Sequence, residues 1–148
     1  MSYKGKFTPL NESKYHGDPS CITFRSLWER KFMIYLDQAP HILEWSSESV
    51  VIPYVYSIDH KWHRYYPDFR VMTLAGETQI IEIKPKKQCA PPNPKRKKTK
   101  SYRKEQYAFI KNQNKWKYAE NYCNQRGWIF KVITEEDIFG VKKLGNKG

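Results

Sequence analysis

Hydrophobic residues recur at helical spacing in two stretches of the chain, and the first lies within residues 26–38. Its apolar positions fall at i, i+4, i+7 and i+8, which form one face of an α-helix. They are Trp28, Phe32, Tyr35 and Leu36. Ser26 precedes this stripe and Glu29 follows Ser26 by three residues, as in a capping box. Ala39-Pro40 ends the pattern, because the residue before a proline avoids the helical conformation. The pattern therefore predicts a helix from just after Ser26 to Ala39-Pro40.

The second helical stretch covers residues 101–126, and Gly127 marks its C-terminal end. The positions at helical spacing are Tyr102, Gln106, Phe109, Ile110, Gln113, Trp116, Lys117, Ala119 and Tyr122. We expect the apolar members to belong to the core rather than to a base-stacking platform. The lysines Lys104, Lys111, Lys115 and Lys117 are expected to be exposed, where some could contact phosphates. Residues 128–133 then predict a strand, and Thr134 is expected to cap a short helix.

Segments typical of β-strands fill the middle of the chain. Residues 42–45, 50–52 and 54–58 are separated by a bend or bulge at 46–48 and by Pro53, which indicates a strand edge or end. Residues 69–74 and 78–83 flank Ala75-Gly76, which predicts a hairpin. Together the elements predict an α/β fold with a mixed β-sheet flanked by α-helices. The last strand is expected to join beside the second hairpin strand through the long helix.

The length of 148 residues suits one compact domain. We place this domain at residues 21–140, after a polar and irregular arm at 1–20 and before a basic tail at 141–148. The three cysteines have no metal-ligand spacing, so they are interpreted as reduced thiols. The N-terminus lacks the apolar segment of a signal peptide. The expected location is therefore the cytoplasm of the cell.

The predicted hairpin gathers charged side chains on one side. Folding the chain about residue 75 places Asp68 opposite Glu82. Because side chains alternate between faces, Glu82 and Lys84 share one face while Ile81 and Ile83 point to the other. Two carboxylates and an ammonium group in one place suit a hard cation such as Mg²⁺, which prefers oxygen ligands.

The Glu82-Ile83-Lys84 triplet and Glu29 also have simpler, structural interpretations. An acid followed two residues later by lysine is common in so charged a chain, and Glu82-Ile83-Lys84 alone is more often part of a cross-strand salt bridge. Glu29 can close a capping box at the solvent, or it can point from the first helical turn toward the hairpin. The apolar strand and the single Pro-Asp pair, Pro67-Asp68, favour a catalytic site.

The charge of the chain predicts an anionic partner. There are 27 Lys and Arg against 15 Asp and Glu, for a formal net charge of +12. Nucleic acid is favoured over a membrane, because no long apolar run is visible. Basic residues concentrate after Lys84 in a proline-rich loop, residues 85–100, and at the start of the second helix. This stretch is interpreted as a clamp on the phosphate backbone, against the alternative of a solvated charge run. Its proposed DNA-binding residues are Lys86, Lys87, Lys95, Arg96, Lys97, Lys98, Lys100, Arg103 and Lys104.

Four motifs, which occur in a consistent order along the chain, resemble those of the PD-(D/E)xK nucleases of the restriction-endonuclease-like fold. Among these nucleases, the closer resemblance is to the catalytic domain of the DNA-cleaving component of Tn7-type transposases. The first is a Ser-x-x-Glu-x-x-Phe helix and the second a Tyr-x-Pro-Asp-Phe strand. The third is an acid-x-Lys-Pro strand and the fourth a Gly-Trp-x-Phe-x-Val-x-Thr-Glu segment. The matching positions are Ser26, Glu29 and Phe32; Tyr65, Pro67, Asp68 and Phe69; Glu82, Lys84 and Pro85; and Gly127, Trp128, Phe130, Val132, Thr134 and Glu135. The resemblance spans about residues 22–138, although the loop at 86–100 is longer than the usual connection.

The resemblance implies a Mg²⁺-dependent DNA endonuclease, in which Mn²⁺ can replace Mg²⁺. It implies that Asp68, Glu82, the Ile83 carbonyl and Glu29 bind the metal, and that Lys84 assists the attacking water. Phage members of the family imply a role in head completion, where double-stranded DNA ends are trimmed before tail joining. Capsid or portal proteins, a homodimer and association with the virion are further expectations. Two alternatives stay open: a structural DNA-binding virion protein with a vestigial site, and a transposase- or resolvase-like component that is active only in a complex.

Overall fold

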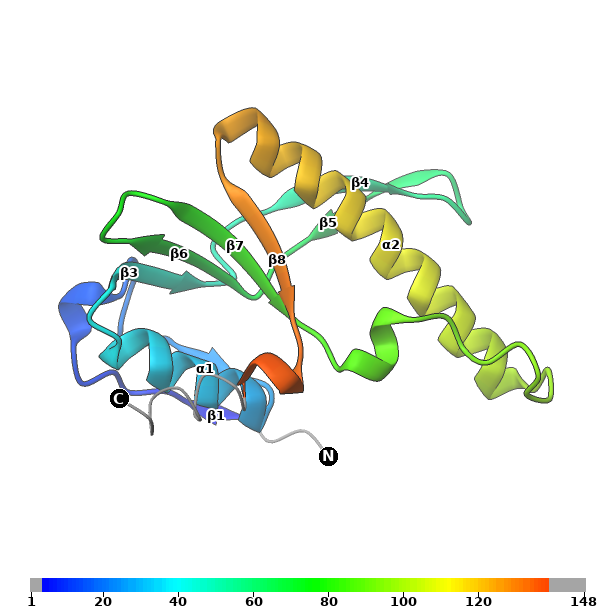
Figure 1. The fold of residues 1–148 in the computed structure, drawn as a ribbon, viewed down its shortest axis with the longest axis horizontal. Coiled ribbons are helices and arrows are strands. Elements are labelled where there is room, and N and C mark those ends of the chain that lie inside the picture. The colour runs from blue at the N-terminus through cyan, green and yellow to red at the C-terminus, as the bar shows by residue number, and fades with distance from the viewer. Residues whose placement is uncertain (1–3, 139–148) are drawn as a thin grey trace.

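A mixed β-sheet with one long helix on each side forms the centre of the computed structural model, which describes residues 4–138 (Figure 1). The elements in chain order are β1 (Gly5–Lys6), η1 (Glu12–Lys14), β2 (Thr23–Phe24), α1 (Leu27–Gln38), β3 (Ile42–Ser47), β4 (Ile52–Tyr56), β5 (Lys61–Tyr65), β6 (Phe69–Thr73), β7 (Thr78–Ile83), η2 (Lys86–Cys89), α2 (Lys100–Arg126) and β8 (Ile129–Ile133). The central sheet has the order β3-β6-β7-β8. Its β7–β8 pair is parallel and the other pairs are antiparallel. The predicted α/β class and the position of the last strand are confirmed.

Helix α1 begins and ends where the sequence predicts. The Ser26 hydroxyl accepts a hydrogen bond of 3.1 Å from the Glu29 N–H, and Ala39 is the C-terminal cap. Phe32 and Leu36 on its apolar face are buried in the main core. This core also contains large side chains of the sheet, including Trp45, Phe69, Val71, Ile81 and Ile83. Burial of this face fixes α1 against the sheet.

The hairpin of β6 and β7 has the predicted register. Phe69 pairs with Ile81, and Met72 pairs with Thr78. Gly76 occupies the turn with a φ of 84°, which favours glycine because it lacks a Cβ. Continuing this register by one residue places Asp68 opposite Glu82, as predicted.

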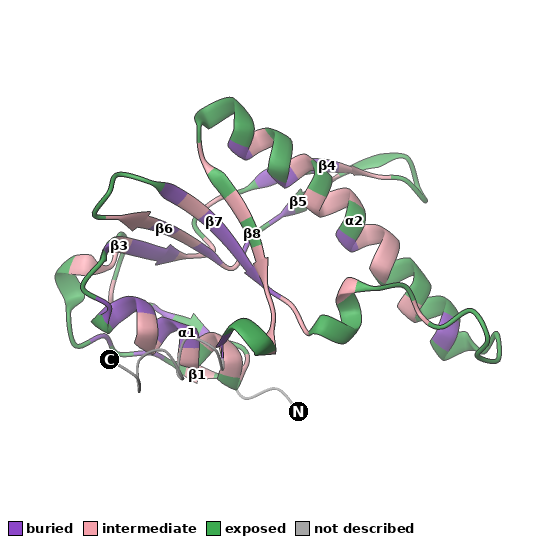
Figure 2. Cartoon of the chain, in the orientation of Figure 1, coloured by how far each residue is buried: buried purple, intermediate pink, exposed green. Residues whose placement is uncertain are grey.

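Strands β4 and β5 form a separate two-stranded sheet that packs under α2. Its buried residues Ile52, Tyr54 and Tyr65 form a second core with Ala119 of α2. Figure 2 colours all buried residues purple, and purple segments lie on β4, β5 and α2. The predicted end of the preceding strand is wrong. The sequence predicts a strand at 42–45 and a bend or bulge at 46–48, but β3 continues through Ser47 and the bend falls at Glu48, whose φ is 51°. This second core explains why the apolar side of α2 is core rather than an exposed platform. Among the described residues, no helix is long and apolar enough to cross a membrane.

The N-terminal arm is more ordered than predicted. Strand β1 pairs with β2, and Phe7 is buried in the main core. The Asp37 carboxylate, which is 1% exposed, accepts hydrogen bonds of 2.9 and 3.0 Å from the backbone N–H groups of Leu10 and Asn11. Outside β1 and η1 the described part of the arm has irregular backbone, and a buried acid on α1 holds it in place. The predicted short helix after Thr134 is confirmed: residues 135–138 are helical, and the Ile138 N–H donates a 3.1 Å hydrogen bond to the Thr134 carbonyl oxygen. The basic tail at 141–148 lies outside the described residues.

Replacing Asp37 tests this attachment. Asp37→Ala leaves two backbone N–H groups without their acceptor, so we expect the free energy of unfolding to fall by about 2–3 kcal/mol. Gln38→Ala is the control, because Gln38 is exposed on the neighbouring position of the same helix. Urea denaturation measures both variants. An equal, small effect of the two changes would show that the carboxylate does not hold the arm.

Candidate active site

The β6–β7 hairpin brings Asp68 and Glu82 together at one end of the sheet. Asp68 lies directly before β6, after the buried Pro67, and its Oδ2 accepts a 2.8 Å hydrogen bond from the Ile83 N–H. Glu82 lies on β7 and is only 7% exposed. The Lys84 ammonium is 3.5 Å from Glu82 Oε2. The structure therefore gathers the two acids and the lysine that the sequence singled out.

Two further side chains that the sequence did not single out for this site approach Glu82. Tyr65, at the end of β5 and 3% exposed, donates a 2.9 Å hydrogen bond to Glu82 Oε1. Lys115 on α2 places its Nζ 5.4 Å from the centre of the Tyr65 ring. The prediction that Lys115 is exposed is wrong, because α2 crosses the open end of the hairpin and carries this lysine into the site. The sequence signal for Tyr65 was its place in the Tyr-x-Pro-Asp motif, and the signal for Lys115 was its place at helical spacing along α2.

The two carboxyl groups are crowded, and this changes their protonation. Burial raises the pKa of Asp68 to about 8, and repulsion from Glu82 and Glu29 acts in the same direction. The Ile83 N–H and Lys84 oppose this rise. Burial also raises the pKa of Glu82, against the opposing effects of Lys84, Tyr65 and Lys115. Burial lowers the pKa of Lys115, while Glu82 raises it. Burial therefore disfavours the charged forms of both acids and of Lys115.

The acids lie in an open cleft of about 610 Å³. Its lining residues are Arg25, Glu29, Glu48, Arg64, Tyr65, Tyr66, Asp68, Glu82, Ile83, Lys84 and Lys115. Both interpretations of Glu29 hold in part: its backbone closes the helix cap with Ser26, and its side chain lines the cleft. Glu29 Oε2 is already bonded to the Arg25 N–H, at 3.2 Å. Within residues 4–138, no three His, Cys, Asp or Glu side chains are arranged to hold a metal ion. Direct ligation by Glu29 would therefore need its side chain to move.

Arg25 and Glu48 form an ion pair at the edge of the cleft. Glu48 is held there by its backbone N–H, which donates a 3.0 Å hydrogen bond to the Asp68 carbonyl oxygen. Its left-handed φ of 51° is uncommon for a residue with a side chain. Neither residue belongs to a recognisable motif. Only the packing of β2 and the β3–β4 connection brings them to the acids.

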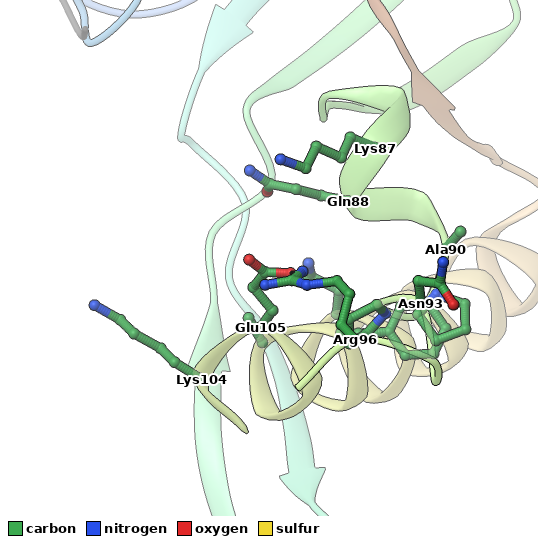
Figure 3. Close-up of a pocket in the computed structure, with 12 residues that line it drawn as sticks. Lys87, Gln88, Ala90, Asn93, Arg96, Lys104 and Glu105 are labelled. Carbon is green, nitrogen blue, oxygen red and sulfur yellow. Dashed lines mark hydrogen bonds and ion pairs between the residues drawn. The ribbon is translucent and has the colours of Figure 1, made fainter. Parts of the chain in front are cut away.

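The nine basic residues assigned to DNA binding lie on η2, the loop and the start of α2, but they are not equally available. Lys86 pairs with Glu136 at 2.9 Å, and Arg96 pairs with Glu105 at 2.6 Å. Lys98 binds the Pro94 carbonyl oxygen and the Tyr102 hydroxyl. The others are exposed: Lys87, Lys95, Lys97, Lys100, Arg103 and Lys104. Figure 3 shows Lys87, Arg96 and Lys104 around a pocket between η2 and α2. The sequence predicts an extended loop for the whole stretch, but its start, Lys86–Cys89, forms the 3-10 helix η2.

Comparison with known proteins agrees with the geometry. Residues 39–135 match the TnsA-like endonuclease N-terminal domain, so the chain belongs to the TnsA-like endonuclease family. The mixed α/β fold is consistent with a nuclease domain of this family. The chain is also 42% identical to the head completion nuclease of Enterobacteria phage T4, in an alignment of 152 positions that covers 100% of this chain and 99% of that protein. No solved structure shows significant similarity.

The crowded carboxyl pair predicts a pH-dependent stability in the absence of metal. A raised pKa in the folded state means that folding binds a proton, so this group opposes folding increasingly as the pH rises from about 4 to about 8. Asp68→Asn removes this opposition and keeps an oxygen that can accept the Ile83 N–H bond. We expect the variant to gain stability over the wild type by up to about 1.4 kcal/mol per pH unit in this range, and the gain to level off above it.

The measurement is urea denaturation in EDTA at several pH values. Glu77→Gln, in the exposed turn of the same hairpin, is the control and should show no such trend. A stability difference between wild type and Asp68→Asn that does not change with pH would contradict the raised pKa.

Proposed function

We propose that this protein is a Mg²⁺-dependent DNA endonuclease that trims double-stranded DNA ends during phage head completion, before tail joining. One observation carries the proposal. The half-buried Asp68 and the buried Glu82 line one open cleft, together with two lysines, Lys84 and Lys115. Two acids in this arrangement attract a cation, and two ammonium groups beside them attract an anion such as a phosphate.

The residues present suit a divalent cation. The carboxylates of Asp68 and Glu82, with the Ile83 carbonyl oxygen, are the hard oxygen ligands that Mg²⁺ or Mn²⁺ takes. Burial raises the pKa of both carboxyl groups, and repulsion from Glu82 adds to the rise for Asp68, so a bound cation would favour their charged forms. Glu29 would act through a water molecule, since its side chain already binds the Arg25 N–H. When bound, the metal supplies a water of lowered pKa and neutralises charge on the scissile phosphate.

The protein's own groups would position the reactants. The Tyr65 hydroxyl holds Glu82 in one orientation, and the Ile83 N–H does the same for Asp68. Lys84 would orient the attacking water and stabilise the charge that develops on the phosphate. Lys115, on the opposite wall, would contact another oxygen of the same phosphate. Positioned charges of this kind stabilise a transition state without having to reorganise.

The biological setting rests on similarity. The related phage T4 protein is named for head completion, and full-length identity of 42% supports the same role here. We propose the host cytoplasm as the place of action, with association to the virion, and capsid or portal proteins as partners. A homodimer would provide two active sites for the two strands of a duplex. The exposed basic residues around η2 and the start of α2 would hold the DNA without reading its sequence.

Removing Asp68 tests the hydrolytic role. We expect Asp68→Ala to lower cleavage of linear duplex DNA by about 1000-fold or more in Mg²⁺, because the metal site loses a main ligand. EDTA should abolish wild-type cleavage and Mg²⁺ or Mn²⁺ should restore it. DNA binding, measured by fluorescence anisotropy in EDTA, should change little.

Glu77→Gln serves as the control and should cleave normally. Cleavage that persists in purified Asp68→Ala protein would reject the assignment of this acid. Wild-type protein that binds DNA but never cleaves it would favour a structural DNA-binding protein. Cleavage that appears only after capsid or portal proteins are added would favour a component that works only in a complex.

Two lysines of α2, Lys115 and Lys111, provide a matched test of the cleft. We expect Lys115→Met to slow single-turnover cleavage by about 10- to 100-fold, because its charge faces the reacting phosphate. Lys111→Met, one helical turn away, is the control. The Lys111 Nζ lies 5.1 Å from the centre of the Tyr56 ring, and Lys111 does not line the cleft. We expect its loss to slow cleavage less than about threefold. Equal effects of the two variants at saturating protein would show that Lys115 only adds general DNA affinity.

A further inference from the structure

A second cavity, of about 490 Å³, lies beside the cleft between η2, the proline-rich loop and the N-terminal half of α2 (Figure 3). Its volume falls in the range of pockets for small organic ligands. None of the residues that line it is a residue to which we assign a role in hydrolysis at the cleft. Its lining residues are Lys87, Gln88, Ala90, Pro91, Pro92, Asn93, Arg96, Lys104, Glu105, Ala108, Phe109 and Asn112.

The pocket has an apolar wall and a basic rim. Phe109 and Ala108 on α2 face Pro91 and Pro92 of the loop. Lys87 and Lys104 are exposed at the rim, as Figure 3 shows. The only acid that lines the pocket among the described residues, Glu105, is paired with Arg96 at 2.6 Å. The rim therefore keeps a positive charge over an apolar interior.

Asn112 contributes a polar side chain to the wall of the pocket. It is 8% exposed, lines the pocket, and its amide makes no hydrogen bond with residues 4–138. A carboxamide offers donors and an acceptor that a ligand in the pocket can bind. A ligand with a planar edge that carries both donors and acceptors would satisfy this amide.

The pocket lies next to the cleft along two elements. Lys84 lines the cleft and Lys87, three residues later, lines the pocket. On α2, Lys115 lines the cleft and Asn112, three residues earlier, lines the pocket. Three residues of helix correspond to about 4.5 Å along its axis. A chain held in the cleft would therefore pass directly to the pocket.

We propose that this pocket binds one unstacked nucleotide of the DNA next to the bond that is cut. The base would lie against Phe109 and the prolines with its edge on the Asn112 amide, and Lys87 and Lys104 would contact the flanking phosphates. Aromatic and apolar walls bind bases of any sequence, while an amide binds a base edge. The positive rim favours an anionic nucleotide over a neutral or basic peptide. The inference rests on the proposed nuclease function, because the cleft defines which nucleotide enters.

Cleavage mapping on DNA with single abasic sites tests the proposal with the full-length protein. End-labelled duplexes that each lack one base are cut in Mg²⁺, and the cut positions are read at nucleotide resolution. We expect wild-type protein to lose about fivefold or more of its cutting at one fixed distance from the missing base, because one stacked base is lost. The distance to the missing base is counted from each cut, so the experiment works even if the protein cuts without sequence preference.

Asn112→Leu should lower overall cleavage by about fivefold and should no longer respond to the missing base, because one base contact is lost. Gln113→Leu, on the exposed neighbouring position, is the matched control and should respond as the wild type does. Phe109→Ala provides a second pocket variant, and urea denaturation checks that every variant is folded. A response to the missing base that the pocket variants abolish, and the control keeps, supports the proposal.

Three results would overturn it. The first is wild-type cutting that ignores every abasic site. The second is a wild-type response that persists unchanged in folded Asn112→Leu and Phe109→Ala, as expected if the pocket binds a protein segment instead. The third is cleavage that depends on Lys87 and Lys104 but not on any base, which would mean that only phosphate is bound. If wild-type protein does not cut at all, the proposed function fails rather than the pocket.

Discussion

The pairing of β6 with β7 is the constraint on which the candidate site depends. Burial of Ile81 and Ile83 in the main core fixes which face of β7 is apolar. Because side chains alternate, the same burial sends Glu82 to the opposite face. The register then places Asp68 across from it, and the Ile83 N–H closes the arrangement with a 2.8 Å hydrogen bond. A shift by one residue would exchange the isoleucines and the acid, so the hydrophobic core itself enforces the position of the carboxylate.

The cleft differs from the rest of this strongly basic chain because its charges are balanced. Four acids and four basic residues line it: Glu29, Glu48, Asp68 and Glu82, and Arg25, Arg64, Lys84 and Lys115. The acids are not evenly spread. Asp68 is half-buried next to the buried Glu82, and desolvation together with repulsion from Glu82 raises the pKa of Asp68. Burying ionisable groups that repel each other costs stability, and such a cost is commonly found where a fold carries chemistry. The two acids and the two lysines line the same cleft, so both signs of charge are offered at one place.

Local patterns predicted the elements whose structure is decided locally. The helix N-cap at Ser26, the glycine at 127 and the alternation in β7 each act within a few residues, and each is confirmed. The Glu29 side chain does not complete the capping box, because it accepts the Arg25 N–H. The parts that were missed depend on contacts between distant segments. Lys115 looks like any lysine on a charged helix until α2 is packed over β4 and β5. Asp37 looks like a solvent-facing acid at the end of α1 until the arm reaches it from residues 10 and 11. The ion pair of Arg25 and Glu48 lacks any signal in the sequence.

Helix α2 connects the two cavities and sets their spacing. The Cα–Cβ directions at positions three apart lie on neighbouring sides of a helix, so Asn112 and Lys115 both face inward while Gln113 is exposed. A helix of 27 residues capped by Thr99 and Gly127 cannot change this spacing without unfolding a turn. On the opposite side, Pro85 redirects the chain between Lys84 and Lys87, and η2 is tied to Glu135 and Glu136 through the backbone and side chain of Lys86. Helix α2 and the segment from Lys84 through η2, which line the cavities from opposite sides, are therefore each held by their own contacts. The distance between the cleft and the pocket is thus set by these elements and not by the proline-rich loop. A DNA strand that enters both would be cut at a distance that the helix fixes.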